Sequence, residues 1–364
     1  MVSRVDSKVK ITVIPHILDF IQPAGTSRGY LEHKKLWIIH IEFHNRLGLG
    51  ECSIIEGLSP DYQNDLHYEN SIQKFLLALK ESNLPIEKWY ESLTRIIPEI
   101  VFFPSIRFGI ETALLSWEKG YYFDNLFTHG KLQIPINGLI WMGNIQKMNE
   151  QVEAKINQGY RTLKFKIGPK TWREERELLL KIRSQFIEPD LTLRVDANGA
   201  FSPNEIWDVL SDLKSLEVHS IEQPVAISEP DCLSELAKAN IIPIALDESL
   251  ISCFTLKDKR ALLDKINPQY IILKPSLHGG ISGVKEWIQL AEERNIAWWM
   301  TSALESNIGL TAIAQFAGEF NISLPQGLGT GGLFKTNFSC GLSLEKGYLS
   351  HHFPEQGPSS SQLA

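Results

Sequence analysis

The 364-residue chain has few cysteines and no long apolar run. Its four cysteines, Cys52, Cys232, Cys253 and Cys340, lie far apart without a Cys-x-x-Cys pair, which argues against a disulfide framework and against a thiolate metal site. No apolar run approaches the roughly 18 residues that span a bilayer, and the N-terminal stretch lacks the pattern of a secretory signal. We therefore expect a cytoplasmic protein without a membrane partner.

A strong excess of one charge is also missing. The formal net charge is -7 at pH 7, and no basic stripe is interleaved with aromatic residues, so nucleic acid is not an expected partner. His40 and His44 have a spacing that suits a metal site on a helix. The β-branched and aromatic residues around them instead predict a strand, on which the two histidines share a face. The oligomeric state is not indicated.

From about residue 130 onward, short β-like segments alternate with helical segments. Strands that alternate with single helices pair in parallel, so the pattern predicts an α/β fold with a (β/α)8, TIM-like barrel. An open doubly wound sheet is disfavoured because its Gly-x-Gly-x-x-Gly fingerprint is missing. The eight predicted strands are 133–138, 162–168, 191–198, 220–225, 242–249, 270–276, 297–303 and 322–327.

The two ends of the chain differ from this alternation. Residues 1–130 begin with strand-like segments and continue with helical ones, which predicts a separate α+β domain. The tail, residues 351–364, is polar and rich in proline and serine, and we expect it to be disordered.

The stretch LKFKIG, residues 163–168, places Lys164 and Lys166 on one face of the second barrel strand. In a parallel barrel one face is covered by helices and the other packs inside, so both lysines are expected inside, near the C-terminal mouth where active sites of this fold lie. The next four strands carry charged residues at equivalent positions, one βα unit apart: Asp196, Glu222, Asp247 and Lys274.

Three carboxylates in a mostly buried site repel one another unless a cation compensates their charge. Oxygen ligands without cysteine or histidine suit a hard divalent cation, so Asp196, Glu222 and Asp247 are expected to bind Mg²⁺. Local salt bridges or helix capping are the alternative. A lysine beside another cation has a lowered pKa, which would make Lys166 a general base with Lys164 as its charged neighbour.

The motifs KFKIG, DANGAF, EQP, LDES, KPS and SALES together resemble the enolase superfamily, in its muconate-lactonising subgroup. The resemblance covers nearly the whole chain. It implies a modified (β/α)8 barrel over residues 131–332, an N-terminal capping domain over 1–130, and a segment, 333–350, that returns to the capping domain. It also implies a small-molecule carboxylate substrate and Mg²⁺ as cofactor, with Mn²⁺ as a candidate substitute.

The resemblance assigns roles to individual residues. Lys166 would take the proton next to the substrate carboxylate and then assist the departure of hydroxide. Lys274, across the mouth, would stabilise the enediolate, and Asn198 would support the metal ligands. The implied substrate-binding positions are Lys164, Ser302, Glu305 and Gly329, the last in the glycine-rich 327–332 loop.

Within the subgroup, PSIRFGIETAL, SALESNIGL and LPQGLGTGGLF look most like the o-succinylbenzoate synthase family, which dehydrates a cyclohexadiene carboxylate in menaquinone biosynthesis. Dipeptide epimerases carry an Asp-x-Asp pair where this chain has QGLGTGG. Mandelate-racemase-type members of the superfamily use a histidine at the position where this chain has Thr301-Ser302. N-acylamino acid racemisation and lactonisation remain open, because they use the same metal site and lysines, and so does a barrel that only binds.

Specificity in this superfamily depends on capping-domain loops, here residues 21–30 and 48–61, which would close over the mouth and exclude water. Arg28 is the strongly basic side chain of the first loop. It is a candidate contact for the succinyl carboxylate, and a solvated arginine is the alternative. Arg107, on the helix predicted over 104–114, is expected to have a structural role.

Overall fold

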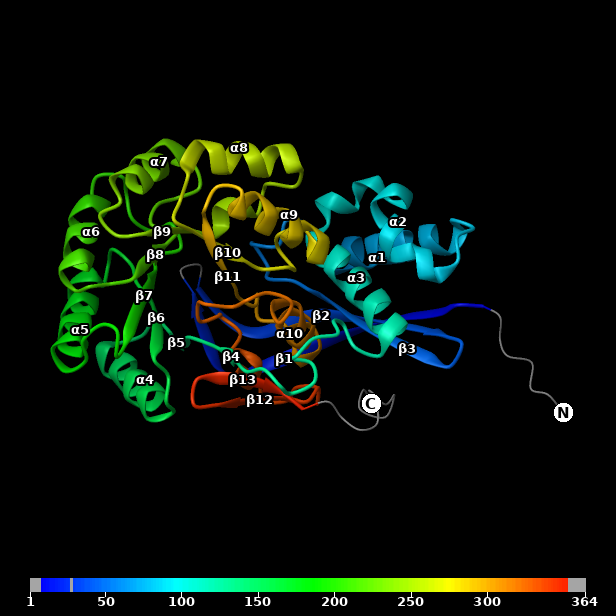
Figure 1. The fold of residues 1–364 in the computed structure, drawn as a ribbon, viewed down its shortest axis with the longest axis horizontal. Helices are drawn as coiled ribbons and strands as arrows, with labels where there is room; N and C mark the ends of the chain where they lie inside the picture. Colours follow the sequence, from blue (N-terminus) through cyan, green and yellow to red (C-terminus); the bar gives the residue numbers. More distant parts are fainter. Residues whose placement is uncertain (1–7, 27–28, 353–364) are drawn as a thin grey trace.

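The N-terminal part of the chain is an α+β unit in the computed structural model, which describes residues 8–26 and 29–352. Its three strands form an antiparallel sheet in the order β1-β2-β3, and Figure 1 shows helices α1 to α3 grouped to one side of the barrel. The elements are β1 (Lys10–Thr26), β2 (Gly29–Phe43), β3 (Arg46–Ser53), α1 (Asp65–Glu81), η1 (Ile86–Lys88), α2 (Trp89–Ile96), η2 (Pro98–Phe102) and α3 (Pro104–Lys119).

Helix α3 packs directly against strand β3 through glycines. A Cβ atom added to Gly50 would lie 1.9 Å from the Gly109 carbonyl oxygen, and one added to Gly109 would lie 2.3 Å from Cys52 Sγ. No side chain fits at either position without moving backbone. The close contact therefore depends on glycine and fixes β3, with Glu51 between Gly50 and Cys52, against the helix.

The pair of histidines is divided between strand and turn. His40 is buried on β2, whereas His44 lies beyond the end of that strand with a φ of 50°. The prediction that both share a strand face is therefore wrong for His44. A turn residue is needed here because β2 and β3 are joined by a tight antiparallel connection.

The second part of the chain is a curled parallel sheet of seven strands in the order β11-β10-β9-β8-β7-β6-β5. Figure 1 shows α4 to α9 arranged in an arc outside these strands. The elements are β5 (Gly138–Ile140), α4 (Ile145–Asn157), β6 (Thr162–Lys166), α5 (Trp172–Gln185), β7 (Thr192–Asp196), α6 (Ile206–Ser215), β8 (Ser220–Glu222), α7 (Pro230–Ala239), β9 (Ile244–Leu246), η3 (Glu248–Leu250), α8 (Leu256–Ile266), β10 (Tyr270–Leu273), α9 (Gly280–Glu292), β11 (Ala297–Met300) and α10 (Asn307–Ala317).

The eighth predicted strand, 322–327, does not form as a strand. Only Gln326 and Gly327 make parallel bridges, to Ile136 and Thr301, and these close the barrel. Pro325 has no N–H to donate, which prevents a longer ladder. The first predicted strand also shifts, because 133–138 contains the two-residue β4 (Ile134–Pro135) and the barrel strand β5 starts only at its last residue.

The C-terminal segment contacts both parts of the chain. After η4 (Gly331–Leu333), Phe334 bridges Phe20 of β1 and the Lys335 N–H donates to the Asp19 carbonyl at 2.9 Å. Strands β12 (Leu342–Glu345) and β13 (Tyr348–His351) then form an antiparallel sheet with β4 beside the barrel. The domain limits at 130, 332 and 350 remain predictions.

The predicted disorder of the tail is wrong at its first residue. His351 ends β13, is buried, and has its Nδ1 2.8 Å from the Thr128 carbonyl oxygen. Pairing in the small sheet and this buried contact order the residue. The rest of the predicted tail from residue 353 lies outside the described residues.

A packed layer fills the barrel interior beneath the mouth. Ala245, Ile272 and Trp299 form a buried cluster, each two residues before the end positions that face the mouth. Arg194 joins this layer with its guanidinium 4.0 Å from the centroid of the Trp299 ring. The layer confines any ligand site to the C-terminal end of the strands. None of the described helices is long and apolar enough to cross a membrane.

We expect Gly50→Ala to lower the free energy of unfolding by about 3 kcal/mol, because the methyl group forces α3 away from β3. Gly143→Ala is the matched control, since its added Cβ would meet only Lys147 Cβ at an ordinary 3.7 Å. Urea denaturation followed by tryptophan fluorescence measures both. Equal stabilities of the two variants would contradict the prediction.

Candidate active site

The strand register brings the predicted charged residues together. Lys166 on β6 pairs in register with Asp196 on β7, and Asp196 pairs in register with Glu222 on β8. Asp247 directly follows β9 and Lys274 directly follows β10. The spacing of one βα unit thus translates into neighbouring side chains at one end of the barrel.

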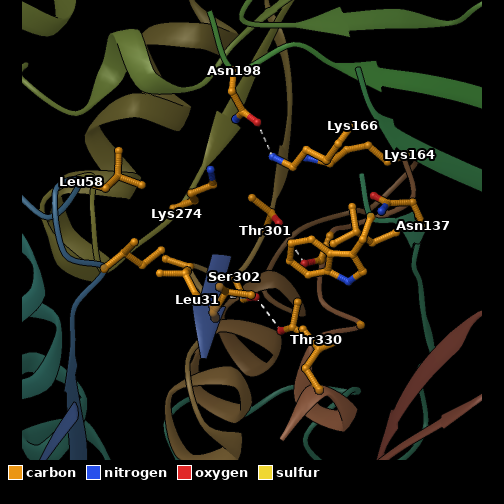
Figure 2. Close-up of a pocket in the computed structure, with 18 of the residues that line it drawn as sticks. Leu31, Leu58, Asn137, Lys164, Lys166, Asn198, Lys274, Thr301, Ser302 and Thr330 are labelled. Atoms are coloured by element: carbon orange, nitrogen blue, oxygen red, sulfur yellow. Dashed lines mark hydrogen bonds between the residues drawn. The ribbon is translucent and has the colours of Figure 1, made fainter. Parts of the chain in front are cut away.

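The lysines contact the carboxylates directly. Lys164 Nζ donates to Asp196 Oδ2 at 2.9 Å and to Glu222 Oε2 at 2.8 Å. Lys166 Nζ donates to the same Asp196 oxygen at 2.7 Å and to Asn198 Oδ1 at 2.7 Å. Figure 2 shows Lys164, Lys166 and Asn198 on one side of the cavity.

On the other side of the cavity, Lys274 Nζ donates to Asp247 Oδ2. Figure 2 shows that the Lys274 side chain approaches the cavity from the side opposite Lys166. Two lysines from strands β6 and β10 therefore face the same space. A planar substrate bound between them would have one ammonium on each face.

Burial and ion pairing set the pKa values of these groups. Burial opposes the charge of Lys164, but Asp196 and Glu222 outweigh it and raise the Lys164 pKa above its ordinary value. Burial, reinforced by the charge of Asp196, raises the pKa of Glu222 to about 8. Lys164 therefore does not act on Lys166 as an uncompensated positive charge, as the sequence suggested, because it pairs with Asp196 and Glu222.

The donor set fits a hard cation. Glu222 Oε1 and Asp247 Oδ1 are buried and have no hydrogen-bond partner, and such oxygens are stabilised by a positive charge. Within the described part of the chain, no three His, Cys, Asp or Glu side chains are already gathered as a metal site, because lysine ammonium groups lie between these carboxylates. Glu222 Oε1 and Asp247 Oδ1 have no lysine contact, whereas both Lys164 and Lys166 hold Asp196 Oδ2.

A cavity of about 320 Å³ lies at this end of the barrel. Both parts of the chain line it: the barrel contributes the three lysines, Asn198 and Ser302, and the capping unit contributes Gly29–Leu31 and residues 55, 56 and 58. Ser302 and Gly329 are on the wall, as the resemblance implied. Arg28 lies outside the described residues.

Glu305 is not part of the cavity wall, which corrects its assignment as a substrate-binding residue. It is fully buried, and its carboxylate accepts hydrogen bonds from the Ser276 hydroxyl and, at 2.7 Å, from the Ala303 N–H. Burial raises its pKa, and the nearby Lys34 ammonium opposes that shift.

Lys34 links the capping unit to the barrel mouth. Its Nζ is buried and donates to the carbonyl oxygens of Ile54 at 2.7 Å and Ala303 at 2.8 Å. Ile54 adjoins the capping residues that line the cavity, and Ala303 itself lines it. Lys34 therefore fixes the distance between the two walls.

Two capping-unit glutamates bind at the starts of barrel helices. Glu51 accepts hydrogen bonds from the N–H groups of Ser306 at 2.9 Å and Gly309 at 2.8 Å, at the start of α10. Glu111, paired with the buried Arg107, accepts the N–H groups of residues 281 and 282 at the start of α9. Arg107 thus has the structural role expected for it.

Several cavity residues were not singled out from the sequence. Glu248 directly follows Asp247, so the motif LDES already contained it. Lys155 and Tyr160 lie near the end of α4 and just after it, where helical periodicity does not reveal that a side chain reaches the cavity. Side chains of a strand alternate between its two faces, so Asn137, two residues before the inward-facing Leu139, could have been predicted to face the cavity. The missed residues include Asn137, Trp141, Lys155, Tyr160 and Glu248.

Comparison with known proteins identifies the class. Residues 147–331 match the Enolase C-terminal domain-like family, from α4 to the start of η4. The chain therefore belongs to the enolase superfamily and is an enzyme of that class, which confirms the predicted family and the barrel with a capping domain.

Individual relatives narrow the class further. The chain is 41% identical over 355 residues to the o-succinylbenzoate synthase of Desulfotalea psychrophila, covering 91% of this chain and 96% of that protein. The crystal structure of MenC from the same organism has a TM-score of 0.81 and 37% identity, covering 94% of this chain and 99% of that one. Muconate lactonizing enzyme from Pseudomonas putida, with a TM-score of 0.78, 18% identity and coverage of 94% and 93%, shares the fold.

Lys34 provides a pH test of the contact between the two walls. Burial lowers its pKa from 10.5 to about 8, against the opposing effect of Glu305 and Glu51. The unfolded chain therefore binds more protons than the folded chain between these values, and the free energy of unfolding gains a contribution that rises with pH across that window. We expect Lys34→Met to lack this contribution.

The measurement is chemical denaturation of the wild type, Lys34→Met and the exposed control Lys88→Met at pH 7, 9 and 10.5. The stability of the wild type should rise relative to Lys34→Met between pH 7 and 10.5, and Lys88→Met should follow the wild type. Parallel profiles of the wild type and Lys34→Met would show that the Lys34 pKa is not lowered by folding.

Proposed function

We propose that this protein is an o-succinylbenzoate synthase, a lyase that dehydrates 2-succinyl-6-hydroxy-2,4-cyclohexadiene-1-carboxylate to o-succinylbenzoate in menaquinone biosynthesis. The observation that carries the proposal is the pair Lys166 and Lys274, which reach one cavity from opposite sides with carboxylates between them. The extensive identity with a relative of that name supports the choice of reaction. A cytoplasmic location belongs to the same proposal.

In this reaction Lys166 takes the proton from the carbon that bears the ring carboxylate. The electrons of the broken C–H bond form an enediolate, and Lys274 holds positive charge against its oxygens. The electrons then return to expel hydroxide from the neighbouring carbon, and the proton on Lys166 converts it to water. Atoms and charge balance without an oxidant or a reductant.

Asp196, Glu222 and Asp247 would hold Mg²⁺, or Mn²⁺ in its place. When bound, the ion supplies positive charge to the substrate carboxylate as negative charge develops on it. The unpartnered oxygens of Glu222 and Asp247 support this assignment. Asn198 would orient Asp196 and Lys166. Its backbone N–H donates to Asp196 Oδ1 at 3.1 Å, and its side-chain Oδ1 accepts a hydrogen bond from Lys166 Nζ.

The assay that tests the function supplies purified protein and Mg²⁺ with the cyclohexadiene substrate and, separately, with N-acylamino acids. We expect dehydration of the first. Racemisation of the acylamino acids without any dehydration would replace the proposed function with the racemase alternative. A dipeptide epimerase is disfavoured because residues 326–332 offer no acid to hold an ammonium group.

Replacing the proposed base tests the mechanism. Lys166→Ala should lower kcat by about 10³-fold, since a positioned general base contributes 10²- to 10⁴-fold. Lys170→Ala, an exposed lysine just beyond the same strand, should leave kcat unchanged. The readout is the absorbance change on aromatisation, together with deuterium exchange from solvent into recovered substrate. Exchange that survives in Lys166→Ala would assign the proton transfer to another group.

The metal assignment has a binding test that is independent of turnover. Asp247→Asn should weaken Mg²⁺ binding in titration calorimetry by about 100-fold, since even changes around metal ligands cost 10- to 100-fold. Asp264→Asn, an exposed partner of Arg294, should bind as the wild type does. A chelator should abolish activity and added Mg²⁺ restore it. Unchanged binding by Asp247→Asn would remove Asp247 from the ligand set.

A further inference from the structure

One lysine of the cavity wall has no acidic partner. Four lysines line the cavity, and three of them pair with Asp196, Glu222 or Asp247. The fourth, Lys155, forms no salt bridge with any residue in the described part of the chain. Its hydrogen-bond contact is a long one, 3.5 Å, to Gln158 Oε1.

The stem of Lys155 lies against the barrel beside the catalytic strand. A Cβ atom added to Gly138 would be 3.2 Å from both Lys155 Cγ and Cδ, so the stem packs against β5 at this glycine. The next residue, Leu139, pairs in register with Lys164. Lys155 is half-buried, and burial lowers its pKa. An ammonium group held there without an anion carries a desolvation cost that no salt bridge offsets.

The groups around Lys155 suit a carboxylate. Its Nζ lies 4.8 Å from the centroid of the Tyr160 ring, and burial raises the pKa of Tyr160 to about 12, so this hydroxyl stays a donor. Gly329 leaves room here, because an added Cβ would lie 3.8 Å from the Tyr160 hydroxyl. Asn137 Oδ1 is buried without a partner, and a rotated amide would present N–H donors instead.

The opposite wall does not suit an anion. Glu56 of the capping unit lines the cavity and carries negative charge, although Lys35 contacts it at 3.0 Å. A carboxylate placed beside Glu56 would be repelled, whereas one placed beside Lys155 would gain a charge-assisted hydrogen bond. The charge distribution therefore orients a substrate that carries two carboxylates.

We infer that Lys155, with the Tyr160 hydroxyl, binds the second carboxylate of the substrate, the one on the succinyl chain. The ring carboxylate then lies at the end of the cavity occupied by Lys164, Lys166 and Lys274. The inference rests on the proposed function, which supplies a substrate with one carboxylate at the reacting carbon and another at the end of a flexible chain. Lys155 thereby selects for a dianion.

The test compares two substrates, the natural acid and an analogue whose succinyl carboxylate is replaced by a neutral carboxamide. The wild type should prefer the acid by about 30-fold in kcat/KM, the size expected of a charge-assisted hydrogen bond. Lys155→Met should lose this preference, mainly through a higher KM for the acid, and should process the amide as the wild type does. Lys155→Arg should retain part of the preference.

Lys147→Met is the matched control, because Lys147 is exposed on the same helix two turns earlier. Lys155→Gln gives a second neutral variant, and thermal denaturation verifies that each variant is folded. A preference for the acid that persists in both neutral variants would overturn the inference. So would a preference that disappears in Arg28→Met and persists in Lys155→Met, because the 21–30 loop would then hold the second carboxylate.

The outcome also separates this inference from the proposed function. A wild type that dehydrates neither the acid nor the amide overturns the function, and the inference with it. A wild type that dehydrates the acid while Lys155→Met keeps the same preference overturns the role of Lys155 alone. A purely structural role would lower kcat/KM for both substrates equally and leave their ratio unchanged, which also contradicts the inference.

Discussion

The cavity depends on carboxylates of the capping unit that bind at the N-termini of barrel helices. In a parallel barrel every outer helix starts at the end where the strands finish, so its free N–H groups and positive dipole end lie beside the active site. Glu51 occupies the start of α10 and Glu111 the start of α9. These contacts place the capping residues over the mouth, and Lys34 then ties the two walls together.

Charge compensation inside the mouth follows the same physical rule. Three lysines, one buried and two partly buried, lie together with three buried carboxylates, and each would be costly alone because removal from water penalises an isolated ion. Strand register decides which charges meet, since Lys166, Asp196 and Glu222 are register partners. A site of high charge density is thereby held on rigid strands above a packed layer that includes Arg194 and Trp299.

The sequence was sufficient for the features that repeat along the chain. The alternation of strands and helices predicted the barrel, and motif spacing predicted the neighbours Lys166, Asp196 and Glu222. Features that depend on contacts through space were missed. Glu305 is buried away from the cavity wall with Lys34 nearby, and Lys155 lines the cavity with its stem packed against Gly138. Neither feature can be predicted from the periodicity of the local sequence, because each depends on a residue elsewhere in the chain.

The barrel is closed by only two isolated bridges, at residues 326 and 327, and this affects which substitutions the fold can accept. Backbone pairing there consists of isolated bridges, whereas neighbouring strands elsewhere are joined by continuous ladders. The adjoining cavity wall includes Asn137 and Gly329. Substitutions along this seam can reshape the space for a substrate without breaking a ladder that the fold requires. The charged residues that pair along β6, β7 and β8 therefore do not depend on the residues of this wall for their positions.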